Sequence, residues 1–109
     1  MTKINYCEET YRLKSHGHAG AAQEGEKDLV CCAVTVLMTT ALAAMEKEGI
    51  RYEIECNEKE GLMDIIGRPK TAQQERCRAI LDTIAAGLEA VAAVHRNYVS
   101  FEKFKWEVN

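Results

Sequence analysis

The feature that most constrains this chain is a run of 17 residues without charge, from Leu29 to Met45. Asp28 precedes the run and can accept hydrogen bonds from the unpaired N–H groups of a first helical turn. Gly49 follows it and suits a left-handed cap. A helix that is apolar on nearly every side is a buried helix. We therefore predict one buried helix against which the rest of the chain packs.

Cys31 falls at the third position of this predicted helix. The unpaired N–H groups and the positive end of the helix dipole favour thiolate over thiol there. His18 lies 13 residues earlier (31 − 18), in a segment that carries Gly17 and Gly20 and that we expect to form a mobile loop over the helix start through residue 27. Its imidazole could take the thiol proton. The same pair also fits a solvated histidine beside a structural thiol.

Composition narrows the class of protein. With 109 residues, 47% hydrophobic and 28% charged, the sequence predicts a single globular domain over residues 1–109. A net charge of −3 argues against a nucleic-acid partner. The uncharged run is shorter than the ~20 residues of a membrane span, so no membrane partner is expected. Five cysteines, an odd number without framework spacing, indicate free thiols and a cytoplasmic location.

The spacing of apolar residues along the chain predicts the order of the strands and helices. Strands are predicted at 2–7, 11–16, 51–56, 62–66 and 104–108, and a second helix at 72–96. The order ββαββαβ predicts an α+β fold, with a mostly antiparallel or mixed sheet and two helices packed on one face.

Finer expectations follow from the same patterns. Thr71 and Gln74 have the spacing of a capping box at the start of the second helix. Alternation places Tyr52, Ile54 and Cys56 on the inward face of their strand. Cys7 and Cys77 also lie on apolar faces and are assigned, with Cys56, to the core.

Two short motifs resemble the ribosomal-processing cysteine protease family, Prp. They are Gly17-His18-Ala19 and, after a glycine-containing loop, Asp28-Leu29-Val30-Cys31. The family pattern is G-H-A, a flexible loop, and D-[IV/L]-V-C-A-x-x-S at a helix start. The resemblance implies a small homodimeric α/β domain whose Cys/His dyad removes a short N-terminal extension from a large-subunit ribosomal protein precursor, after an aromatic residue. It implies Cys31 as nucleophile and His18 as general base and acid, with Gly17 and Asp28 as supporting motif residues and no cofactor.

The chain departs from the family pattern at two positions. Cys32 stands where the family usually has alanine, and Thr35 stands where it usually has serine. Thr35 keeps a hydroxyl one turn beyond Cys31 and is counted as a supporting residue. Cys32 points about 100° around the helix from Cys31, so we expect it to face the core.

Two other functions fit the same residues. Cys31 and Cys32, with His16 and His18, could bind a soft metal or act as a thiol redox pair, although adjacent cysteines do not easily hold one ion. The chain could also be a non-catalytic dimeric interaction module in which Cys31 only fills the core.

Overall fold

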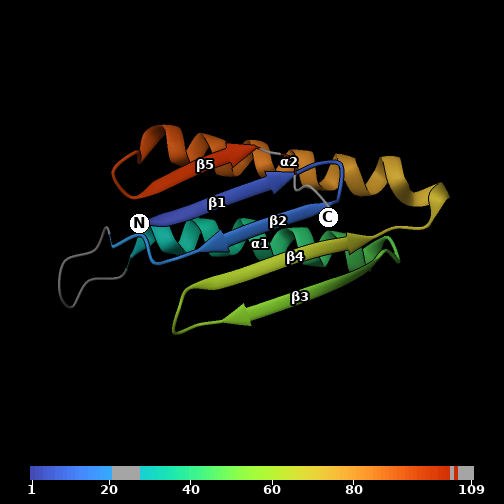
Figure 1. Cartoon of the computed structure of the whole chain (residues 1–109), viewed down its shortest axis with the longest axis horizontal. Helices are drawn as coiled ribbons and strands as arrows, with labels where there is room; N and C mark the ends of the chain where they lie inside the picture. Colours follow the sequence, from blue (N-terminus) through green and yellow to red (C-terminus); the bar gives the residue numbers. More distant parts are fainter. Residues whose placement is uncertain (21–27, 104, 106–109) are drawn as a thin grey trace.

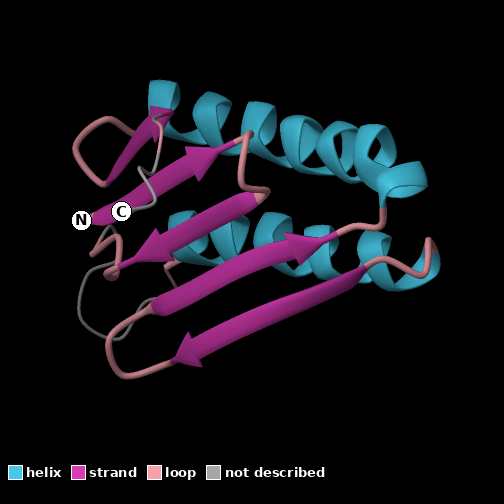
Figure 2. Ribbon diagram, turned by 45° about the vertical axis from the view of Figure 1, so that its right-hand side comes forward, coloured by secondary structure: helices cyan, strands magenta, loops and turns pink. Residues whose placement is uncertain are grey.

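A computed structural model of the chain describes residues 1–20, 28–103 and 105. It is an α+β fold in which one five-stranded sheet carries two helices on the same face, as the sequence predicts (Figures 1 and 2). The elements are β1 (Thr2–Cys7), β2 (Arg12–His16), α1 (Leu29–Lys47), β3 (Arg51–Asn57), β4 (Leu62–Arg68), α2 (Gln74–Val94) and β5 (Val99–Lys103), with a 3₁₀ turn at Thr71–Gln73.

The sheet is mixed, with the strand order β3-β4-β2-β1-β5. β1 and β2 form an antiparallel hairpin, β3 and β4 form a second one, and β2 joins the two by pairing with β4. α2 returns the chain to the end of the sheet where β1 begins, so β5 runs in the same direction as β1 and pairs with it in parallel. β3 and β5 are therefore the two edge strands.

The core lies between the sheet and the helices. Along α1, residues spaced four, four, three and four apart form one buried stripe, which is the spacing of a single helix face. This stripe packs with the buried side chains of the strands and of α2. The α1 stripe consists of Val30, Val34, Met38, Ala41 and Met45.

The prediction that α1 is buried on nearly every side is wrong. Leu29 is 74% exposed and Val36 is 57% exposed. The reason is that α1 has one sheet beneath it and one helix, α2, beside it, so its outer face has nothing to cover it. By length and composition alone α1 would be long and apolar enough to cross a membrane. In this structure its buried stripe instead packs in the protein core.

β3 turns its apolar side chains to the helix-facing side as predicted, but the prediction that Cys56 lies in the core is wrong. Tyr52 is half-buried, Ile54 is 45% exposed and Cys56 is exposed. β3 is the outermost strand of the sheet and lies beyond the edge of α1 (Figure 1). Tyr52 packs against the core and donates to Glu46 of α1 at 2.6 Å, whereas Ile54 and Cys56 lie beyond the cover of the helix. Cys7 and Cys77 are buried as predicted.

Two boundaries also differ from the prediction. The last described strand is Val99–Lys103, whereas the strand predicted at 104–108 lies outside the described residues except for Lys105. Thr71 does not cap α2, which begins at Gln74 after the 3₁₀ turn. The Lys70 N–H donates instead to Gln73 Oε1, at 3.0 Å.

Tyr6 provides a test of the packing between the sheet and α2. Its ring is 1% exposed and its hydroxyl donates to Asp82 Oδ1. Burial, and then the hydrogen bond to the Asp82 carboxylate, raise the pKa of Tyr6 far above its usual 10.0. Because the folded state holds this proton more tightly than the unfolded state, the resulting stability is complete below pH 10 and is lost as the pH rises above it.

We expect Tyr6→Phe to lower the free energy of unfolding at neutral pH by about 1 kcal/mol, through loss of the hydrogen bond. Above pH 10 the variant should lose stability less steeply than the parent, because the group that titrates is gone. Urea unfolding from neutral pH to about pH 11 measures both effects. Tyr98→Phe is the control, and equal slopes for parent and Tyr6→Phe would contradict the assignment.

Candidate active site

A cavity of about 300 Å³ lies between α1 and the helix-facing side of the β3–β4 hairpin. It forms because the hairpin extends beyond the helix, which leaves the inner side of β3 open. Four of the five predicted site residues line it, namely Gly17, His18, Cys31 and Thr35. The rest of the lining comes from β1, β2, α1 and the hairpin and consists of Thr2, Ser15, Val34, Met38, Cys56, Asn57, Glu58, Gly61, Leu62 and Met63.

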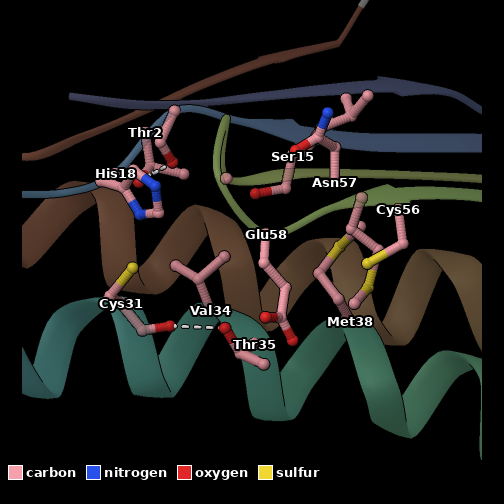
Figure 3. Close-up of a pocket in the computed structure, with 14 residues that line it drawn as sticks. Thr2, Ser15, His18, Cys31, Val34, Thr35, Met38, Cys56, Asn57 and Glu58 are labelled. Atoms are coloured by element: carbon pink, nitrogen blue, oxygen red, sulfur yellow. Dashed lines mark hydrogen bonds between the residues drawn. The ribbon is translucent and has the colours of Figure 1, made fainter.

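Cys31 is held at the start of α1 by the predicted cap. Asp28 lies just before the helix with extended backbone, and its Oδ1 accepts a hydrogen bond from the Cys31 N–H at 2.9 Å. The Cys31 side chain is half-buried and its sulfur points into the cavity (Figure 3). The thiol thus lies at the N-terminal end of a 19-residue helix, where the helix dipole places partial positive charge.

His18 reaches the same cavity from the end of β2. Its ring is exposed, lies above α1 and faces the Cys31 sulfur across the cavity (Figure 3). His18 Nε2 is 3.2 Å from the carbonyl oxygen of Lys59. A carbonyl can only accept, so this contact requires the proton on Nε2 and leaves Nδ1 of the neutral ring with its lone pair. Nδ1 is therefore the nitrogen that can take a proton.

Gly17 occupies a position that only glycine fits. Its φ is +93°, and a Cβ at this position would collide with the carbonyl oxygen of Met1. The Gly17 carbonyl in turn accepts from Thr2 Oγ1 at 3.0 Å. The start of β1 thus fixes the backbone that carries His18.

Thr35 lies one turn beyond Cys31 and uses its hydroxyl within the helix. Thr35 Oγ1 donates to the Cys31 carbonyl oxygen at 2.9 Å. The hydroxyl therefore satisfies the backbone of the candidate nucleophile, and a serine could make the same bond.

The floor of the cavity is apolar and its rim is polar. Val34 and Met38 come from α1, and Met63 comes from β4, where it pairs in register with Cys56 of β3. Glu58, at the hairpin turn, extends toward the helix above Thr35 (Figure 3). Sequence reasoning missed the hairpin residues as part of the site. The alternation that puts Cys56 on the helix-facing side was the available signal.

One other sequence expectation, the core position of Cys32, differs from the structure. Cys32 is exposed rather than in the core, since the 100° step from Cys31 leads to the uncovered outer side of α1. His16 is exposed and follows Ser15, which points into the cavity, so His16 projects from the opposite side of the sheet.

Within residues 1–20, 28–103 and 105, no group of three or more His, Cys, Asp or Glu side chains could hold a metal ion. The loop predicted to be mobile lies, over residues 21–27, outside the described part of the chain.

Comparison with known proteins places this geometry in context. Residues 1–100 match the family described as cysteine protease Prp. Two similar solved structures are of an essential ribosomal processing protease Prp from S. aureus, one with a covalently linked product peptide (TM-score 0.81) and one with a substrate peptide (TM-score 0.76). Each is 17% identical, and each match covers 95% of this chain and 100% of the other.

A third similar structure is SMU.848 from Streptococcus mutans, with 19% identity, a TM-score of 0.74 and coverage of 94% of this chain and 91% of the other. Comparison with curated proteins finds no match. At these identities the solved structures show a common fold.

The capping role of Asp28 can be tested by measuring stability, without an assay of catalysis. We expect Asp28→Ala to destabilise the protein by about 1 kcal/mol, because the Cys31 N–H loses its acceptor. Asp28→Asn is the matched control, since it keeps a capping oxygen and should retain most of the stability. Urea unfolding measures the difference. Equal losses in the two variants would show that the charge of Asp28, rather than its capping bond, matters.

Proposed function

Because the chain belongs to the cysteine protease Prp family, we propose that it is a cysteine endopeptidase in which Cys31 and His18 form the catalytic dyad. One observation carries this proposal: the two residues come from separate segments and line one cavity, with the thiol at a helix N-terminus. A half-buried thiol that points into a cavity suits a nucleophile better than it suits core filling. This observation favours an enzyme over an interaction module.

The proposed chemistry is acyl transfer to the thiol. His18 Nδ1 takes the proton of Cys31, and the thiolate attacks the peptide carbonyl carbon, so that a C–S bond forms and the carbonyl becomes an oxyanion. The imidazolium returns the proton to the amide nitrogen as the C–N bond breaks, and one peptide leaves as an amine. His18 then takes a proton from water, whose oxygen attacks the thioester. The C–S bond breaks, the second peptide leaves as an acid, and the thiol regains its proton.

The oxyanion needs N–H donors, and the first turn of α1 is their proposed source. The Cys31 N–H already donates to Asp28 Oδ1, and the Cys32 N–H donates to the Asp28 carbonyl at 3.0 Å. The donors proposed for the oxyanion are therefore the earlier N–H groups, of Leu29 and Val30, which a helix start leaves unpaired. Loss of one such donor costs about 3 kcal/mol in comparable sites.

The proposed substrate is a large-subunit ribosomal protein precursor with a short N-terminal extension, cut after an aromatic residue. The S. aureus structures, described as a ribosomal processing protease with substrate and product peptides, support a peptide substrate of this kind. The apolar floor formed by Val34, Met38 and Met63 suits a bulky apolar side chain next to the cut bond. A net charge of −3 and Glu58 at the rim suit a basic protein. We propose a cytoplasmic location, where such a precursor is made.

Incubation of the purified protein with this precursor, followed by mass spectrometry, tests the proposal. The parent should release the extension, Cys31→Ala should release none, and His18→Gln should be slower by about 10²- to 10⁴-fold. Cys32→Ala is the matched control, because its thiol is adjacent in sequence but exposed on the outer side of α1, and it should keep the parent rate. Cleavage by Cys31→Ala at the parent rate would overturn the dyad.

We also propose that the chain acts as a homodimer. The exposed apolar side chains of Leu29 and Val36 on the outer face of α1 support a second copy as its cover. Val36→Lys should shift the protein from dimer to monomer in analytical ultracentrifugation without loss of helical circular dichroism. A monomeric parent at tens of micromolar would contradict this assignment.

A further inference from the structure

The turn between β3 and β4 contacts the backbone and the ring of the candidate base. We infer that this turn, through the Lys59 carbonyl and Gly61, positions His18 with its proton on Nε2 and Nδ1 toward the thiol. This inference rests on the proposed dyad and assigns to the hairpin a role that is distinct from lining the cavity.

Two hydrogen bonds join the turn to the segment that carries His18. The His18 ring meets the Lys59 carbonyl oxygen, 41 residues away in sequence, through Nε2 at 3.2 Å. The Gly17 N–H donates to the Glu60 carbonyl oxygen, also at 3.2 Å. Ring and backbone are therefore held by neighbouring carbonyls of the same turn, which restricts both the position and the rotation of the imidazole.

Gly61 allows this close approach. Its φ is +64°, and a Cβ at this position would lie 2.8 Å from the Gly17 carbonyl oxygen and 3.2 Å from His18 Cε1. Thr2 Oγ1 holds the Gly17 carbonyl by a hydrogen bond, so that group is not free to retreat from an added methyl. The added methyl group of Gly61→Ala would therefore collide with the Gly17 carbonyl and crowd the His18 ring.

The turn itself is fixed by local bonds. Asn57 Oδ1 accepts from the Glu60 N–H at 3.3 Å, and the Gly61 N–H donates to the Glu58 carbonyl at 3.2 Å. These bonds direct the Lys59 carbonyl toward the ring. His18 is otherwise exposed, so this turn supplies the one hydrogen bond that the described residues give its ring.

A held tautomer matters because only the lone-pair nitrogen can accept the thiol proton. If the ring rotated, or if Nδ1 carried the proton, Cys31 would lose the basic nitrogen that the proposed dyad assigns to it. Misplacement of a catalytic group by about 1 Å can lower a rate by about 10²-fold. We therefore assign Gly61 and the Lys59 carbonyl as positioning groups that act through His18.

Gly61→Ala and Gly49→Ala form a matched pair of variants. Both place a side chain at nearly the same positive φ, +64° and +66°, but no atom lies within 4 Å of a Cβ at Gly49. Both variants therefore carry similar backbone strain, but only Gly61→Ala places a methyl group against the segment that carries His18. For Gly61→Ala we expect kcat for precursor cleavage to fall by about 10²-fold with little change in KM. Alkylation of Cys31 by iodoacetamide should slow as well, and Gly49→Ala should match the parent in both assays.

Nitrogen NMR of the histidine rings gives a readout that needs no substrate, and its prediction for the parent does not depend on the folding of Gly61→Ala. In the parent, neutral His18 should carry its proton on Nε2, with its signals assigned by their loss in His18→Gln. Gly61→Ala should show a mixture of the two tautomers.

A parent ring protonated on Nδ1, or a Gly61→Ala variant that matches Gly49→Ala in tautomer and alkylation rate, would overturn the inference. If the parent leaves the precursor uncut, the substrate assignment fails. The tautomer and the alkylation rate still decide the role of the turn in that case.

Discussion

The hydrogen bond from the Cys31 N–H to Asp28 Oδ1 fixes where α1 begins, and the site depends on that beginning. If the helix started one residue later, the Cys31 N–H would no longer meet this acceptor and Cys31 would lie one position closer to the N-terminal end of the helix. The α1 core stripe fixes the rotation of the helix, because Val30, Val34 and Met38 can face the sheet in only one orientation. The cap thus sets the place of Cys31 in the first turn, and the stripe sets the direction of its thiol.

The mismatch in width between the sheet and the helices creates the space beside that thiol. Two helices cover the face of the sheet, but the outermost strand, β3, extends past α1 (Figure 2). The exposed Ile54 and Cys56 result from this overhang, and the cavity lies beneath it. The same hairpin then turns back to His18 through Lys59 and Gly61. The uncovered edge of the sheet is therefore part of the site rather than a defect in the packing.

The sequence predicted what depends on local chemistry. The cap at Asp28, both hairpins, the element order and the helix positions follow from side-chain type and periodicity, and the structure confirms them. Apart from the cap expected at Thr71, which a 3₁₀ turn replaces, the wrong predictions concern which elements pack against which. Periodicity gives the face on which Cys32 or Cys56 lies but not whether anything covers that face. The contact of Lys59 with His18 joins residues 41 apart, and no local pattern encodes it.

Among the residues that the structure describes, the lining of the cavity comes from the chain between Thr2 and Met63, and neither α2 nor β5 contributes to it. Local unfolding at the two edges of the sheet therefore has different consequences for the cavity. Separation of β5 from β1 releases the Thr2 N–H from the Tyr98 carbonyl but leaves the β3–β4 wall in place, whereas separation of β3 from β4 removes that wall and the support of the imidazole together. The described residues that line the candidate site thus lie in the first three-fifths of the chain, and α2 and β5 close the core from the other side.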